Sequence, residues 1–303
     1  MRKLFSALAV LSLAAVAALG QQSAPTLRIV SEDGNRLPSE LMYGNTRVKP
    51  LRLRPGTNTP ITIDDADFFV QQQYVDFLSR FPDQAGFQFW MGQINNCGPD
   101  TTCVGFQRDN TSGAFFLSIE FRGTGYYVYR LQRASFGTLP TYASFMPDTR
   151  AVGNGVIIGE PGAEQKLDAN KASFTSTWVT RPSFLASFPT SMTPAEYVDK
   201  LVQRAGVSPE SVNRNALVSE LAANNTTAGR ASVLRKIVES AAFDQKEKNP
   251  AFVFMQYVGY LRRDPDPEGF AFWLKKLNDH GGDFHEAQMV RSFLVSGEYR
   301  SRF

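Results

Sequence analysis

The chain contains a segment of 22 residues that occurs twice. Residues 69–90 and 252–273, related by a constant offset of 183, are identical at 13 of their 22 positions. The shared pattern is Phe-Val-x-x-Gln-Tyr-Val-x-aromatic-Leu-x-Arg-x-Pro-Asp-x-x-Gly-Phe-x-Phe-Trp. Self-similarity of this kind is the signature of a repeated supersecondary unit, so it constrains the architecture more than local propensity does.

Each segment has the apolar spacing of two helices separated by a turn. Apolar residues at i, i+4, i+7 and i+8 form one face of a helix, and after a Pro-Asp turn a second face follows at i, i+3, i+4 and i+7. The first segment forms these faces with Val70, Tyr74, Phe77 and Leu78, then with Phe87, Trp90, Met91 and Ile94. The second segment forms them with Val253, Tyr257, Tyr260 and Leu261, then with Phe270, Trp273, Leu274 and Leu277.

A third element completes each copy. Residues 115–122 parallel residues 293–300 at an offset of 178, so the loop before this element is five residues longer in the first copy. A weaker copy over 193–246 has Tyr197 and Ser240 at matching places but lacks the Pro-Asp turn and the Phe-Trp pair. The sequence therefore predicts a mainly α-helical fold of repeated three-helix units, two clear and one degenerate.

The turn residues have specific expected roles. Asp83 and Asp266 are natural N-caps, because a carboxylate accepts the free backbone N–H groups at a helix start. Gly86 and Gly269 stand in the first turn of the same helices, where glycine is less stable than alanine by roughly 0.5–1 kcal/mol. We expect a close approach of each helix to its partner helix to explain both glycines.

The two tryptophans of the pattern have two possible roles. Trp90 and Trp273 share a helix face with apolar neighbours, which favours burial at the centre of each helical unit. The alternative is an exposed platform on which sugar rings stack.

The remaining sequence divides the chain into five parts. Residues 1–20 have the charged start, apolar run and small-residue end of a secretory signal peptide. Residues 21–66 alternate apolar and polar residues and predict a short extended or β arm. We expect a first helical domain over 67–137, an irregular connector with one helix over 138–192, and a second helical domain over 193–303, in which the degenerate copy 193–246 precedes the clear copy 250–303.

Charge and cysteine content indicate the compartment. Removal of the signal takes away Arg2 and Lys3 and leaves 30 basic against 29 acidic residues, which gives no electrostatic reason for binding nucleic acid. Cys97 and Cys103 are the only cysteines, and in an exported chain such a pair predicts a local disulfide. We expect an exported protein, periplasmic, extracellular or at the cell surface, with no transmembrane segment in its mature part.

The sequence offers little material for catalysis or metal binding. None of the common nucleophile, phosphate-loop or zinc-protease motifs is present, and His280 and His285 lie five residues apart, which does not place them on one helix face. The run from Asp264 to Gly269 imitates the start of a calcium loop, but its twelfth position is Lys275 rather than glutamate. Glu120 and Glu298 could form a hydrolytic carboxylate pair, but their recurrence in both copies favours a structural role. We expect no enzyme activity and no cofactor.

The recurring residues resemble a known family. The pattern Tyr-x-x-x-Leu-x-Arg-x-Pro-Asp-x-x-Gly-Phe-x-x-Trp contains Tyr74, Arg80, Asp83, Gly86 and Trp90 in one copy, and Tyr257, Arg263, Asp266, Gly269 and Trp273 in the other. It resembles the bacterial family called domain of unknown function 4214 over residues 68–125 and 250–303, and is more distantly similar to the helical linker domains of phycobilisomes. The resemblance implies a helical, secreted, non-enzymatic module and carries no catalytic residue.

These observations together predict a non-catalytic, secreted or cell-surface module that engages a protein or a polysaccharide. A carbohydrate-active hydrolase and a calcium-dependent surface module are the alternatives. The sequence leaves the partner and the oligomeric state open.

Overall fold

The structure is a computed structural model that describes residues 26–29, 39–43, 46–48 and 52–303. The proposed signal peptide, residues 1–20, lies outside the described residues. The chain divides into two compact units, Met1–Pro50 and Leu51–Phe303. Among the described residues, none of the helices is both long enough and apolar enough to cross a bilayer.

The described part of the first unit is a small antiparallel sheet. Its strands are β1 (Thr26–Ile29), β2 (Ser39–Tyr43) and β3 (Thr46–Val48), in the order β1-β2-β3. Thr26 pairs with Met42, and Leu41 pairs with Val48.

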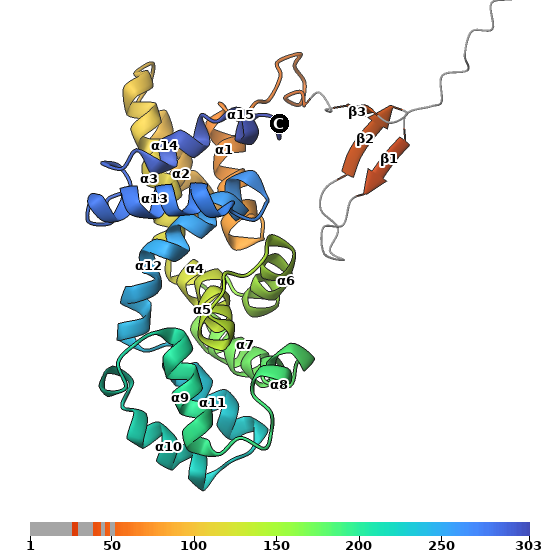
Figure 1. The fold of residues 1–303 in the computed structure, drawn as a ribbon. Helices are drawn as coiled ribbons and strands as arrows, with labels where there is room; N and C mark the ends of the chain where they lie inside the picture. The colour runs from red at the N-terminus through yellow and green to blue at the C-terminus, as the bar shows by residue number, and fades with distance from the viewer. Residues whose placement is uncertain (1–25, 30–38, 44–45, 49–51) are drawn as a thin grey trace, which may run out of the picture. The chain divides into compact units, whose positions relative to one another are not determined.

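The second unit is mainly helical (Figure 1). Its first segment comprises α1 (Ala66–Gln73), the π-helical turn η1 (Tyr74–Leu78), α2 (Gln84–Asn95), α3 (Thr101–Leu117) and α4 (Ile119–Gly123). Its last segment comprises α12 (Ala241–Met255), the π-helical turn η3 (Gln256–Leu261), α13 (Pro267–Asp279), α14 (Met289–Leu294) and α15 (Gly297–Arg300). Between them lie α5 (Gly125–Phe136), α6 (Tyr142–Gly153), α7 (Ala163–Trp178), α8 (Pro182–Ser187), α9 (Pro194–Ala205), η2 (Glu210–Val212), α10 (Arg214–Ala223) and α11 (Thr227–Val238).

The predicted apolar faces of the first helix in each copy lie in the core. Val70, Tyr74 and Phe77 are buried, as are Val253, Tyr257 and Tyr260 at the equivalent places. Both first helices end in a π-helical turn followed by a residue in the left-handed conformation, Ser79 in one copy and Arg262 in the other. Left-handed backbone is uncommon outside glycine, so the same departure at equivalent positions shows that the two segments share local geometry as well as sequence.

The first and last segments pack directly against each other, although more than a hundred residues separate them. Helix α14 packs on α3, and η1 packs on η3; Figure 1 shows α14 beside α3. Phe77 meets Tyr260 with ring centres 5.6 Å apart, and Phe116 meets Phe252 at 4.7 Å.

The connector contains more helix than the sequence indicated. The single helix expected there corresponds to α7, whose Leu167, Phe174 and Trp178 are buried. Helices α6 and α8 are additional. Helix α6 packs on α5 and α7, and α7 packs on α11, so these residues contribute to the helical unit.

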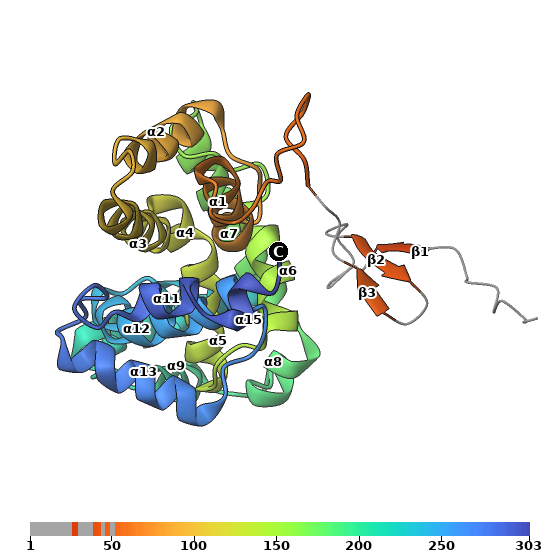
Figure 2. The ribbon, with the colours of Figure 1, turned by 90° about the horizontal axis from the view of Figure 1, so that it is seen from above.

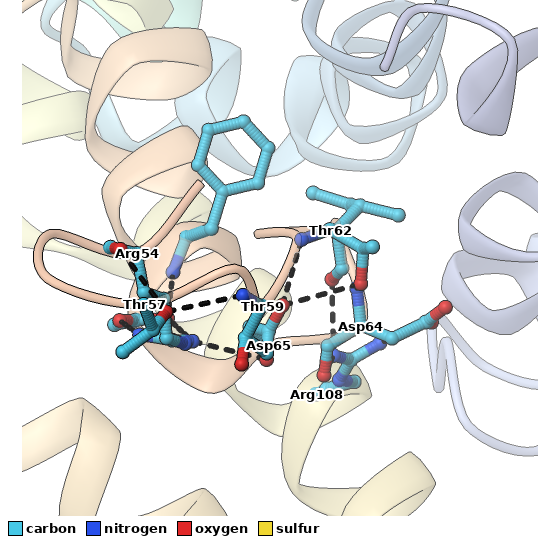
Figure 3. Close-up of polar contacts among 10 residues, drawn as sticks. Arg54, Thr57, Thr59, Thr62, Asp64, Asp65 and Arg108 are labelled. Carbon is cyan, nitrogen blue, oxygen red and sulfur yellow. Dashed lines mark hydrogen bonds and ion pairs between the residues drawn. The ribbon is translucent and has the colours of Figure 1, made fainter. Parts of the chain in front are cut away.

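Residues 52–65 precede α1 and are held to the helical unit by ion pairs and hydrogen bonds (Figure 3). Arg54 binds Asp65 at 3.0 Å and Asp67 at 2.6 Å. Arg108 of α3 donates to the backbone oxygen of Ile63 at 3.0 Å, and Asp64 accepts a hydrogen bond from Arg300 of α15 at 2.9 Å. The acidic residues before α1 therefore bind arginines that come from both ends of the unit.

Candidate interaction surface

One aspartate holds the start of the second helix in each clear copy. Asp83 lies at the N-cap of α2 and accepts the N–H of Gly86 at 2.8 Å, and Asp266 accepts the N–H of Gly269 at 2.7 Å. Burial opposes ionisation of Asp83, but the Gly86 N–H and the nearby Arg80 charge outweigh it and lower the pKa of the carboxyl group. Both carboxylates are thus structural acceptors.

An arginine links each turn to the third element of its copy. Arg80 binds Glu120 through two hydrogen bonds of 2.6 and 2.8 Å, and Arg263 binds Glu298 through two of 2.6 and 3.2 Å. Each guanidinium also lies over a tyrosine ring, 5.0 Å from the centre of Tyr74 in the first copy. The recurring glutamates are therefore held by arginines.

The two glycines make room for a tyrosine hydroxyl. A Cβ atom placed on Gly86 would overlap the hydroxyl of Tyr74, and one on Gly269 would overlap that of Tyr257. We expected the partner helix itself to approach closely. The close neighbour is instead the tip of a tyrosine side chain from the preceding π-helical turn.

We predict that Asp83→Ala will lower the free energy of unfolding by about 0.5–2 kcal/mol. Asp83→Asn will cost less, because its side-chain oxygen still accepts the Gly86 N–H. The equivalent change at Asp266 acts in the same direction. Because the folded-state pKa of Asp83 is lowered, its contribution is present above pH ~4 and is lost as the pH falls through the lowered pKa. Urea unfolding at pH 7 and pH 3 measures this, and an Asp83→Asn cost equal to that of Asp83→Ala at pH 7 would contradict it.

The pattern's tryptophans lie at the edge of the core. Trp90 packs on Phe115 with ring centres 5.8 Å apart, and Trp273 packs on Phe293 at 5.5 Å. Both are only half-buried, so neither fills the centre of its unit as we expected. The helix face was predicted correctly, but the degree of burial of the tryptophans was not. Apolar periodicity gives the direction in which a side chain points and says little about what covers it.

Next to each tryptophan is an exposed phenylalanine. Phe89 is 56% exposed and meets Trp90 edge to face, and Phe272 is 58% exposed and meets Trp273 in the same way. The ring centres are 4.9 and 5.0 Å apart. Sequence reasoning missed these two residues. The available signal was an aromatic residue placed off the apolar face of its helix and present in both copies.

A second pair of exposed apolar residues recurs at the end of the third helix. Leu117 of α3 is 48% exposed, and Val295, its equivalent directly after α14, is 59% exposed. We call Phe89, Trp90 and Leu117 the first aromatic surface and Phe272, Trp273 and Val295 the second. Helices α2 and α13, which carry the aromatic residues, lie on opposite sides of the helical unit in Figure 2.

The degenerate copy, residues 193–246, has different contacts. Tyr197 is fully buried, and its hydroxyl donates to the backbone oxygen of Arg230 at 2.9 Å. Ser240 caps α12 by accepting the N–H of Phe243, as Ser118 and Ser296 cap α4 and α15. Within the described residues this segment presents no exposed Phe-Trp pair.

Cys97 and Cys103 lie at disulfide-bonding distance, with Cα atoms 5.5 Å apart. Cys97 follows the end of α2, and Cys103 lies in the first turn of α3. The bond therefore closes the loop that is longer in the first copy.

Three of the possible calcium and zinc ligands have protein partners. Asp264 accepts the N–H of Tyr142, Asp266 caps α13, and His285 contacts Asn110 at 2.7 Å. In the part of the chain that the structure describes, no three His, Cys, Asp or Glu side chains come together as a metal site requires.

A groove of about 400 Å³ lies between α7 and α11. Alanine and serine side chains contribute much of its lining, and its charged residues are paired: Arg235 binds Glu239 at 2.9 Å, and Lys236 binds Glu220 at 2.5 Å. No particular ligand chemistry follows from this lining.

Comparison with known families finds a match for the last segment of the chain. Residues 234–303, which include α12 to α15, match the family model of DUF4214, described as a domain of unknown function. This last segment resembles a DUF4214 domain. No curated protein and no solved structure matches the chain. The matched DUF4214 segment contains the second aromatic surface and the Arg263–Glu298 bridge.

Proposed function

We propose that the chain is an exported, non-catalytic module that binds a protein partner through its two aromatic surfaces. The observation that carries the proposal is the recurrence of an exposed phenylalanine, backed by a half-buried tryptophan, at the same position of both copies. Single exposed apolar residues are normal on any protein. The aromatic pair is retained in both copies although nine of the 22 positions of the repeated segment differ, and a binding role explains this better than chance does.

We also propose that residues 67–137, 193–246 and 250–303 derive from one three-helix unit, with the last two in one helical domain and residues 21–66 as an extended arm. Three contacts recur in both clear copies and support this. They are the aspartate cap, the arginine–glutamate bridge and the tyrosine over glycine. The serine cap recurs in all three copies.

A protein partner is favoured over a polysaccharide by the exposed apolar residues beside the Arg80–Glu120 bridge. The Arg80–Glu120 bridge brings residues 80–81 next to residues 119–120, and the exposed side chains of Phe81 and Ile119 flank it. Sugar sites combine an aromatic platform with convergent polar groups, whereas protein interfaces have an apolar centre rich in aromatic residues. The apolar character around this bridge fits the second description.

The same contacts make the two alternatives less favoured. Glu120 and Glu298, the candidate carboxylate pair of a hydrolase, are each bound by an arginine from their own copy. Asp264 and Asp266, two of the three acidic residues in the calcium-like run, accept backbone N–H groups. Export is supported by the signal-like start of the sequence and by the bonded cysteine pair, since disulfides persist in oxidising compartments.

The test is sedimentation of the labelled protein with envelopes of the producing cells. We expect Phe89→Ser with Phe272→Ser to weaken this binding about tenfold or more, because truncation of a central aromatic costs ~2 kcal/mol or more at an interface. Each single substitution should reduce binding less, because the other surface remains. Envelopes treated with proteinase should no longer bind the parent protein.

The matched control is Phe106→Ser, which changes another half-exposed phenylalanine, one that stacks on His285. It should leave binding unchanged. Binding that survives the double substitution would remove the aromatic surfaces from the proposal. Loss of binding after glycosidase treatment, but not after proteinase treatment, would identify a polysaccharide as the partner instead.

A further inference from the structure

The contact between the first and last segments is made by equivalent elements. The turn η1 meets η3, and α3 meets α14, so each copy presents the same face to the other. Phe77 and Tyr260 occupy the same position in their copies, and their rings touch across the contact. This is the self-complementary arrangement of a two-fold dimer interface, here formed within one chain.

A buried ion cluster crosses this contact. The Asp76 side chain is only 1% exposed. It accepts hydrogen bonds from Arg302 at 2.8 and 3.1 Å and from Arg262 at 3.3 Å. Arg302 also donates to the backbone oxygens of Gly259 at 2.9 Å and Tyr260 at 2.7 Å. A carboxylate of the first copy is thus compensated by two arginines of the second.

The cluster is a part of the contact that does not recur. At the position of Asp76 the second copy has Gly259, and at the positions of Arg262 and Arg302 the first copy has Ser79 and Thr124. If two first copies met through the same faces, each Asp76 would be buried opposite serine and threonine. If two second copies met, their arginines would face glycine. Each pairing would bury charge without compensation, which is strongly unfavourable.

We propose that the Asp76–Arg262–Arg302 cluster selects the partner of each copy. It favours the pairing of first with second copy inside one chain over the pairing of like copies between two chains. The apolar contacts are shared by both kinds of pairing and supply attraction without selection. Selection by charges that are compensated in only one pairing is the device by which closely similar interfaces avoid wrong partners.

The test is the mass of the folded protein in solution across a wide concentration range. In the variant Asp76→Gly, Arg262→Ser, Arg302→Thr, both copies carry glycine, serine and threonine at these positions, so the selection by this cluster is removed. We expect the parent to keep one mass at all concentrations. The triple variant should form dimers, and their fraction should increase with concentration.

Two further variants make the result decisive. Asp76→Asn keeps the shape of the side chain and removes only the charge, so it reports on selection if the triple variant fails to fold, and it should dimerise more weakly. Glu247→Gln removes an equally buried carboxylate that lies outside this contact, and it should remain at the parent's mass. Dimers of Glu247→Gln would attribute the effect to general destabilisation. The proposal is overturned if the folded triple variant and the folded Asp76→Asn variant both keep the parent's mass. If the triple variant does not fold, the parent's mass in folded Asp76→Asn alone overturns it.

Discussion

Replacing Glu247 by leucine will lower the free energy of unfolding by about 3–5 kcal/mol. The Glu247 side chain is 1% exposed and binds Arg133 at 3.0 and 3.4 Å. It also accepts the hydroxyl proton of Tyr129 at 3.0 Å. Burial and the Glu247 charge together raise the pKa of Tyr129 well above its ordinary value, so the hydroxyl stays protonated and donates. Loss of the carboxylate leaves both donors without their acceptor, and urea unfolding measures the cost.

The size of this effect comes from the orphaned partners more than from the strength of the pair. A double variant, Glu247→Leu with Arg133→Met, should therefore recover part of the loss, because an apolar replacement of a whole buried pair is often neutral. Asp279→Asn breaks the exposed pair with Lys275 and should cost less than about 1 kcal/mol. A Glu247→Leu cost as small as that of this control would contradict the prediction.

Local features of the fold could be predicted from the sequence. The buried faces of Val70, Tyr74 and Phe77 follow from helical periodicity, and the cap at Asp83 follows from an aspartate in the Pro-Asp turn between two helical patterns. Both depend on residues within two turns of each other. The cysteine pair belongs to the same class, since six residues separate its members.

Features that depend on distant residues could not be predicted. Arg302 and Asp76 are 226 positions apart, and Arg133 and Glu247 are 114 apart, so no local pattern links them. The π-helical turns were also missed, because apolar residues at i and i+4 suit an α-helix equally well. The exposed rings of Phe89 and Phe272 stand outside the apolar periodicity, and only their recurrence distinguished them.

Gly86→Ala will lower the free energy of unfolding by about 1–3 kcal/mol, although alanine is the better helix former. The new methyl group would overlap the Tyr74 hydroxyl. That hydroxyl has little freedom to move, because Tyr74 is buried against Phe115 with ring centres 4.7 Å apart, and the Arg80 guanidinium covers its ring. Desolvation by burial raises the pKa of Tyr74 to about 12, so the hydroxyl keeps its proton at neutral pH.

The same reasoning predicts which second substitution rescues the first. Tyr74→Phe removes the oxygen that the methyl group would meet, so Gly86→Ala should cost much less in a Tyr74→Phe background than in the parent. Coupling between substitutions in direct contact is typically about 0.5–3 kcal/mol. Gly269→Ala with Tyr257→Phe is the matched pair in the last segment and should show the same sign, because the same hydroxyl lies over the same position of α13. Gly92→Ala, at a position of α2 with open space around it, is the control and should stabilise slightly through helix propensity. Additive costs at Gly86 and Tyr74 would show that the glycine is required for a reason other than the tyrosine.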